Sequence, residues 1–248
     1  MKYFFLLCFI FVFSHAFAQD KNKFYALDAK LNETTLDSSK YILWVHEKED
    51  SNWQFDYYRT WGPLVKTQTF ADREGTVLNG RSSLYNSFGN LDSTGTYDHG
   101  KKNGVFYKMK SISKDSLVGF KQYDYLNDSL VKMKDLLADS NKKRDADSIK
   151  YTDPGYPGGL QEWDSYLSHN LKYPDRALDK KIQGKVYVRF WVDKEGSLSD
   201  IFIEKSVEYS TDQEAIRVIK SSGKWQPASE NGVVKSAYMT EPVDFKLQ

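Results

Sequence analysis

The sequence predicts an α+β protein in which an antiparallel β meander precedes a smaller domain, where helices pack on a small antiparallel sheet. Three observations lead to this expectation. Short β-like runs alternate with turn residues over 23–132. A charged, apolar-poor stretch, 133–153, is typical of a solvated linker. Over 154–248 the chain changes to mixed strand and helix patterns. We therefore expect two domains joined by a linker.

The first 18 residues have the pattern of a cleavable signal peptide. Lys2 precedes an apolar run from Tyr3 to Phe13, and Ala16-Phe17-Ala18 has the small-x-small form of a cleavage site before Gln19. The run is short for a bilayer span, which needs about 20 residues. Cys8 lies inside this segment, so the mature chain would contain no cysteine and no disulfide. We expect export to the periplasm; the alternative is a segment retained as an inner-membrane anchor.

Composition and motifs argue against several function classes. Lys and Arg number 35 and Asp and Glu number 34, which removes the electrostatic argument for nucleic acid. His46, His99 and His169 lack metal-ligand spacing. The sequence has no G-x-S-x-G nucleophile motif, and its carboxylates form no recognisable acid/base pair. We therefore expect no enzymatic activity, no catalytic residues, no cofactor and no metal.

The N-terminal part is predicted to form strands separated by glycine-containing turns. Tyr41 to Val45 is the clearest strand, rich in aromatic and β-branched residues. Weaker strands are Trp53 to Tyr58, Leu64 to Phe70, Arg81 to Tyr85 and Val105 to Met109. Asn79-Gly80 and Asn103-Gly104 are hairpin signals, because both residue types tolerate the positive φ angles of tight turns.

Part of this region is quasi-repetitive. The repeated elements are Asn79-Gly80-Arg81, Phe88-Gly89, Gly95-Thr96-Tyr97 and Gly100 to Gly104. Residues of about 76–110 thereby resemble one or two MORN-type repeats, in which short hairpins stack. The resemblance implies a scaffold or a partner-binding surface.

The C-terminal part opens with two helical patterns. Leu160, Trp163, Leu167 and Leu171 recur at helical spacing and predict a helix that faces the core. Pro174 suits the first turn of a short second helix, because its missing N–H has no intrahelical partner there.

The following residues predict strand, turn, strand, helix, strand. Val186, Val188, Phe190 and Val192 alternate along the first strand, and Gly196 closes the turn after it. Ile201 and Ile203 share one face of the second strand. Ser210 and Gln213 have the spacing of a capping box that opens a helix ending near Gly223. The last run, Val233 to Leu247, contains Pro242 and is therefore expected at a sheet edge.

An ordered set of motifs carries a second resemblance. The set comprises Tyr156 to Gly159, Tyr173-Pro174-Asp175-Arg176-Ala177, Ile182 to Val188, Val192 to Gly196 and Lys224-Trp225-Gln226-Pro227. Over residues of about 154–248 the chain resembles the TonB C-terminal domain family. The motif residues with structural roles are expected to be Tyr173, Pro174, Gly184, Gly196, Trp225 and Pro227.

The resemblance implies a partner and a mode of binding. TonB-like domains pair their last strand with an extended segment of an outer-membrane TonB-dependent transporter. Main-chain hydrogen bonds would then supply the affinity. The partner-binding residues are expected to be Ser236, Tyr238, Met239, Thr240, Val243 and Phe245.

Several functions remain open on the sequence. The first is a periplasmic binding protein of TonB-dependent transport, because the chain lacks the long Pro-rich spacer of a force transducer. The alternative is a membrane-anchored energy transducer that links proton motive force to outer-membrane import. A third is a non-enzymatic envelope scaffold that contacts another envelope protein or peptidoglycan. The open sheet edge could also pair with a second copy to form a homodimer.

Overall fold

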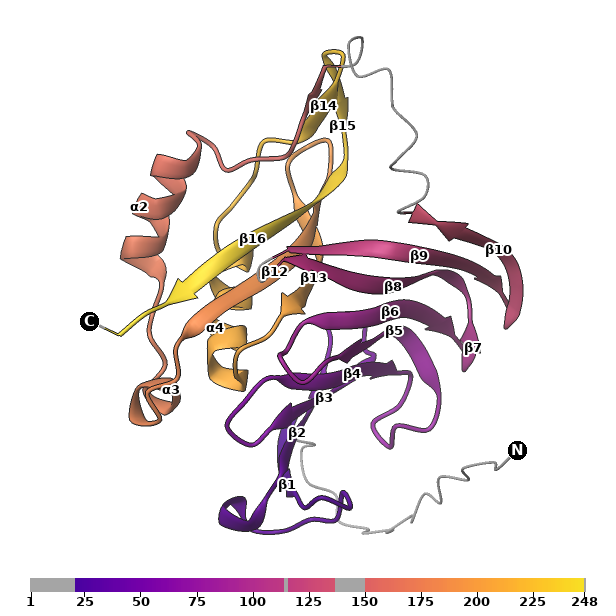
Figure 1. The fold of residues 1–248 in the computed structure, drawn as a ribbon, viewed down its shortest axis with the longest axis vertical. Helices are drawn as coiled ribbons and strands as arrows, with labels where there is room; N and C mark the ends of the chain where they lie inside the picture. Colours follow the sequence, from indigo (N-terminus) through magenta and orange to yellow (C-terminus); the bar gives the residue numbers. More distant parts are fainter. Residues whose placement is uncertain (1–20, 114–115, 137–149, 248) are drawn as a thin grey trace.

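The computed structural model describes residues 21–113, 116–136 and 150–247. Figure 1 shows a curved N-terminal sheet beside a C-terminal part that contains all the labelled helices. The N-terminal strands are β1 (Asn22–Leu27), β2 (Tyr41–Glu47), β3 (Trp53–Arg59), β4 (Leu64–Phe70), β5 (Leu78–Tyr85), β6 (Leu91–Asp98), β7 (Lys101–Lys102), β8 (Gly104–Ser113), β9 (Ser116–Leu126) and β10 (Ser129–Asp135), with a 3-10 turn η1 (Leu36–Ser38) after β1.

The N-terminal sheet is the predicted antiparallel meander. Its order is β1-β2-β3-β4-β5-β6-β8-β9-β10, with the short β7 paired to β6. Each predicted strand is present, because β-branched and aromatic residues suit a pleated surface that is half buried. Val45, Phe55 and Phe70 form a small buried cluster on one face. The N-terminal half of the predicted fold class is confirmed.

The hairpin expected at Asn79-Gly80 is wrong. Both residues lie inside β5, where Gly80 has a φ of +118° and pairs with Tyr97. The turn between β4 and β5 lies earlier, where the Asp72 carboxylate accepts hydrogen bonds from the backbone N–H groups of Thr76 and Val77. Because the chain already turns at Asp72, where the carboxylate satisfies the local N–H donors, it does not turn at Asn79-Gly80, and both residues lie in the strand.

The C-terminal part contains the predicted helices and a small antiparallel sheet. Its elements are α2 (Leu160–Asn170), α3 (Asp175–Asp179), β12 (Gly184–Val192), β13 (Leu198–Lys205), α4 (Tyr209–Lys220) and β16 (Ala237–Phe245). The sheet order is β13-β12-β16. Val186, Val188, Phe190 and Val192 are fully buried on one face, as their alternation predicts. Helices α2 and α4 pack on this face (Figure 1).

Two expectations for the C-terminal part need correction. Helix α4 is capped by Glu208, whose carboxylate accepts a hydrogen bond from the Ser210 N–H, and not by a Ser210 capping box. The last run is also not one strand: Val233–Lys235 is a separate strand, β15. It pairs with β14 (Ala228–Glu230), which pairs with β11 (Tyr151–Thr152) in a second three-stranded sheet. Asn231 and Gly232 have positive φ and turn the chain between β14 and β15.

The meander and the C-terminal part share one buried hydrophobic cluster. Tyr58, Leu64 and Tyr85 of the meander belong to the same cluster as Phe190 and Ile203 of the small sheet. The Tyr85 hydroxyl donates a hydrogen bond of 2.7 Å to the Ile203 carbonyl. The two parts are therefore joined by buried apolar surface.

Polar groups also contribute to the contact between the meander and the C-terminal part. The Ser206 hydroxyl accepts a hydrogen bond from the Leu64 N–H at 2.8 Å and donates one to the Asp212 carboxylate. Ser206 also donates its own N–H to the carbonyl of Gly89. Alanine at position 89 would place its Cβ 2.3 Å from the Ser206 carbonyl oxygen, so glycine is required for this approach.

Limited proteolysis is expected to cut the chain without separating its two parts. Residues 137–149 lie outside the described residues, and the predicted linker 133–153 and the domain boundaries around it stay predictions. If protease cuts there, the shared cluster should keep the fragments together in native buffer. Gel filtration of the nicked protein, followed by denaturing electrophoresis, measures this. Fragments that elute separately would show that the shared cluster is too weak to hold the two parts together.

Candidate docking edge

Strand β16 forms one edge of the small sheet. Among the described residues it pairs only with β12, in a regular antiparallel register from Gly184↔Phe245 to Val192↔Ala237. Figure 1 shows β16 at the border of the sheet, with the C-terminus just beyond it. The backbone groups on its other side are not used by any described strand, so they are available for pairing.

The side chains of β16 alternate between two environments. Val243 and Phe245 are buried in the core, and Met239 is partly buried against it. Tyr238 and Pro242 are exposed on the opposite face, where Thr240 is half-buried. Among the residues expected to contact a partner, Val243 and Phe245 therefore offer only their main chain. Ser236 lies in the link between β15 and β16 and precedes the edge strand.

Aromatic and charged groups surround Tyr238 on the exposed face. The Tyr238 ring lies 4.8 Å from the Trp191 ring and 5.0 Å from the Arg189 guanidinium. Its hydroxyl donates a hydrogen bond to the Asp200 carboxylate, which also pairs with Arg81 of β5. Burial, followed by the hydrogen bond to Asp200, raises the pKa of Tyr238. These contacts fix the start of β16 and connect it to the meander.

A buried carboxylate lies on the other face of β16. Glu241 is only 7% exposed and points to the core side, between Met239 and Val243 in the alternation. Burial, with a smaller contribution from the Asp164 carboxylate of α2, raises the pKa of Glu241 to about 7. Neither the hydrophobic alternation nor a family motif identified Glu241 in the sequence as a buried residue, because an isolated glutamate normally indicates exposed surface.

The motif residues support the sheet from its two ends. Tyr173 donates a hydrogen bond of 2.5 Å to the Ile182 carbonyl, and its ring packs edge-on against Phe245. Pro174 was expected in the first turn of α3 but is its N-cap residue, so the helix begins one residue later than expected. Gly184 opens β12, where a Cβ would lie 3.0 Å from the Val207 side chain.

At the other end, Trp225 is a packing residue. It is buried against Trp163 and Phe190, and its indole N–H donates to the Ser222 hydroxyl at 2.8 Å. Gly196 has a φ of +81° and approaches the Trp225 backbone so closely that a Cβ would lie 2.2 Å from its carbonyl oxygen. Pro227 lies between Trp225 and strand β14.

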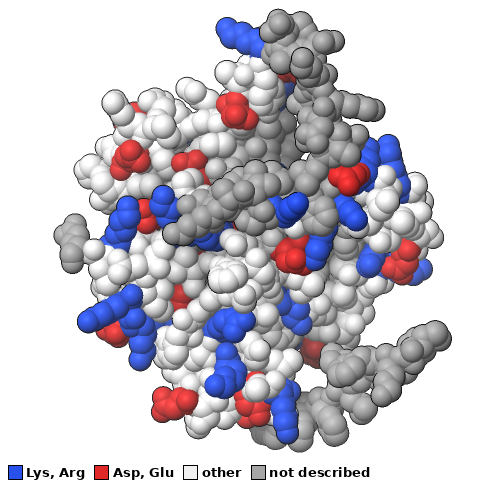
Figure 2. All heavy atoms as spheres, viewed as in Figure 1, with Lys and Arg blue, Asp and Glu red and all other residues white. Residues whose placement is uncertain are grey.

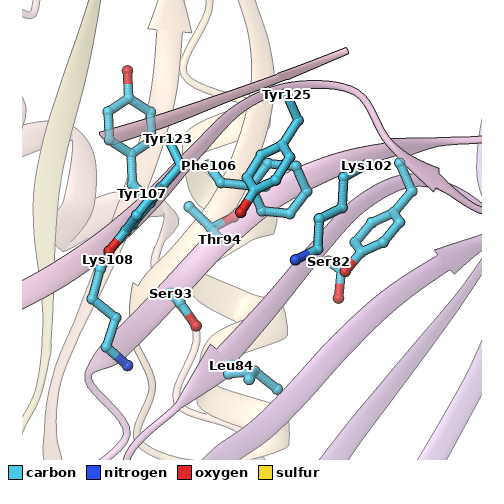
Figure 3. Close-up of a pocket in the computed structure, with 12 residues that line it drawn as sticks. Ser82, Leu84, Ser93, Thr94, Lys102, Phe106, Tyr107, Lys108, Tyr123 and Tyr125 are labelled. Atoms are coloured by element: carbon cyan, nitrogen blue, oxygen red, sulfur yellow. The ribbon is translucent and has the colours of Figure 1, made fainter. Parts of the chain in front are cut away.

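A shallow hollow lies away from β16, on the meander. Its volume is about 270 Å³, and strands β5, β6, β8 and β9 line it. Figure 3 shows Lys102 and Lys108 at opposite ends, with Ser93 between them. The Phe106 ring lies against Gly95, where a Cβ would be 2.1 Å from the ring. The Lys102 ammonium lies 4.9 Å from the Tyr125 ring, and Lys108 pairs with Asp92. Both cations are thus engaged within the meander.

The part of the chain that the structure describes holds neither a metal-binding cluster nor a helix suited to cross a membrane. No group of three or more His, Cys, Asp or Glu side chains there could hold a metal ion. None of the helices there has the length and apolar character needed to span a bilayer. Figure 2 shows basic and acidic side chains interspersed over the displayed face, without a region of one sign.

Comparisons with known proteins point to the part of the chain that contains β16. A search of curated proteins finds no match. Two solution structures of the Helicobacter pylori TonB C-terminal domain are similar to this chain. One, of residues 179–285, is 25% identical, covers 37% of this chain and 87% of that chain, and has a TM-score of 0.30. The other, of residues 194–285, is 24% identical, covers 35% and 91%, and has a TM-score of 0.29. Residues 169–247 of this chain match the family described as Gram-negative bacterial TonB protein C-terminal.

Proposed function

We propose that this protein is a periplasmic binding protein of TonB-dependent transport systems. In this proposal, β16 docks an extended segment of an outer-membrane transporter by strand addition. The supporting observation is the edge position of β16 inside the segment that matches the TonB C-terminal family. Residues 1–18 would be removed as a signal peptide, and the mature N-terminus would distinguish this protein from an anchored energy transducer.

The position of Pro242 indicates which backbone groups would meet the partner. Along a strand, successive residues direct their N–H and C=O groups to opposite edges. Pro242 has no N–H, so it is tolerated best where the ladder to β12 does not need a donor. Its alternation set, which includes Tyr238 and Thr240, would then face the free edge. Met239 and Val243 would use their donors on β12.

Replacing Thr240 by proline is expected to weaken peptide binding, whereas alanine at the same position is expected to have little effect. Proline removes one main-chain donor, which is worth about 0.5–1.5 kcal/mol, or roughly threefold to tenfold in Kd. Alanine keeps the N–H. The measurement is titration of the mature protein with peptides from the N-terminal segments of outer-membrane transporters, with folding checked by circular dichroism.

The two variants also separate the competing interpretations. Equal losses for alanine and proline would indicate recognition of the Thr240 side chain. If the well-folded wild-type protein binds no such peptide, strand addition is contradicted and the scaffold function is favoured. Concentration-dependent self-association that Thr240→Pro abolishes would instead identify a homodimer formed through the same edge.

The meander would then serve as a scaffold that holds the docking domain. We propose that its hairpins around 76–110 are of the MORN type and present a surface to another envelope component, with peptidoglycan as one option. The contacts of Leu64 and Tyr85 with the C-terminal part support a scaffolding role.

A further inference from the structure

The carboxylate of Glu241 is the least explained polar group near the docking edge. Only 7% of the surface of Glu241 is exposed, although its carboxylate oxygens keep some contact with solvent, and the carboxylate has no hydrogen bond or ion pair to any residue that the structure describes. The nearby charged group is another carboxylate, Asp164, which is exposed on α2. A buried anion is costly without a compensating cation, and a like charge nearby increases that cost.

Because Glu241 lies on the edge strand, a segment that pairs with the free edge could supply the compensating cation. Glu241 belongs to the edge strand itself, and its side chain lies on the face that α2 covers. In an added antiparallel strand, the residue opposite Glu241 would have its Cβ only about 5 Å away, on the same face. A long basic side chain at that position would reach both Glu241 and Asp164.

We propose that the docked segment carries a lysine or arginine whose cationic group binds between Glu241 of β16 and Asp164 of α2. This inference rests on the proposed strand addition and specifies the chemistry of the partner. On the opposite face of β16, around Tyr238, the carboxylates of Asp200 and Glu204 are already paired with Arg81 and Arg189, so they are less available to a basic residue of the docked segment. The basic residue would therefore occupy alternate positions of the docked segment, those that face α2.

The test uses the full mature chain and designed extended peptides. One peptide is built from alternating valine and threonine with a single central lysine, and a second replaces that lysine by norleucine, which has no charge. A third series moves the lysine by one position at a time. At pH 8, where Glu241 is ionised, we expect the lysine peptide to bind about tenfold more tightly than the norleucine peptide, because lysine forms a charge-assisted hydrogen bond with a carboxylate that otherwise has no partner in the protein. The preference should alternate with the lysine position.

Variants of this chain assign the preference to the proposed residues. Glu241→Gln should bind the norleucine peptide as the wild type does and should lose most of the lysine preference. Asp164→Asn should lose part of it. Glu162→Gln provides a matched control, since Glu162 is exposed on the same helix and should leave the preference unchanged.

The outcomes distinguish the inference from the function on which it rests. Binding of all peptides without a lysine preference, or a preference that survives in Glu241→Gln, would overturn the cation site and leave strand addition standing. Absence of binding by every peptide would overturn both. Circular dichroism of each variant confirms that a loss of preference is not a loss of fold.

Discussion

Replacement of Arg176 by alanine is expected to lower the free energy of unfolding by about 3–5 kcal/mol, because it leaves a buried carboxylate without its cation. The Arg176 Nε donates to the Glu208 carboxylate at 2.5 Å, and Glu208 is fully buried. The same guanidinium donates to the Thr60 carbonyl and lies 4.1 Å from the Trp61 ring. One side chain thus connects α3, the start of α4 and the meander.

Urea denaturation of the mature protein measures this loss. Arg176→Lys should recover part of the stability, since an ammonium keeps the charge but not the two-directional donor geometry of arginine. Lys246→Ala is the control: its ion pair with Asp244 is exposed, and such pairs contribute about 0–1 kcal/mol. A loss below about 1 kcal/mol in Arg176→Ala would contradict a stabilising role of the Arg176 ion pair with the buried Glu208 carboxylate.

Stability is expected to fall as the pH rises from about 5 to 8, and Glu241→Gln should reduce that fall. The pKa of Glu241 is raised from 4.5 to about 7, and burial raises the pKa of Asp212 to about 8. Between the ordinary and the raised values, the folded state binds more protons than the unfolded state. The stabilising contribution is therefore complete at low pH and is lost as the pH passes the raised pKa.

The difference between Glu241→Gln and the wild type should depend on pH. Near pH 5 both side chains are neutral and stability should be similar. At pH 8 the glutamine variant should be more stable by roughly 1–2 kcal/mol, a value reduced from the full linkage because the carboxylate retains some contact with water. Denaturation at the two pH values measures this, with Glu195→Gln in the exposed turn as control. Equal differences at both pH values would contradict a titrating Glu241.

Local patterns were sufficient for most of the secondary structure. The strands at Tyr41–Glu47 and Gly184–Val192 follow from β-branched residues and period-2 alternation, which depend on neighbours in the sequence. The fold class could be predicted for the same reason, and the edge position of the Pro242 strand could be predicted because proline has no N–H to donate to a ladder. The errors occurred where a distant or non-standard partner replaced the usual one, as with the Glu208 cap of α4 and Gly80 within β5.

What the sequence by itself determined is therefore the set of elements and the region that contains the docking edge. Only the tertiary structure decided that the meander and the small sheet share one core, because residues such as Leu64 and Ser206 meet across a large sequence separation. It also decided that Glu241 is buried beside Asp164 whereas most other acidic residues stay exposed. Burial depends on which surfaces pack together, and the alternation of a single strand cannot specify the element that covers it.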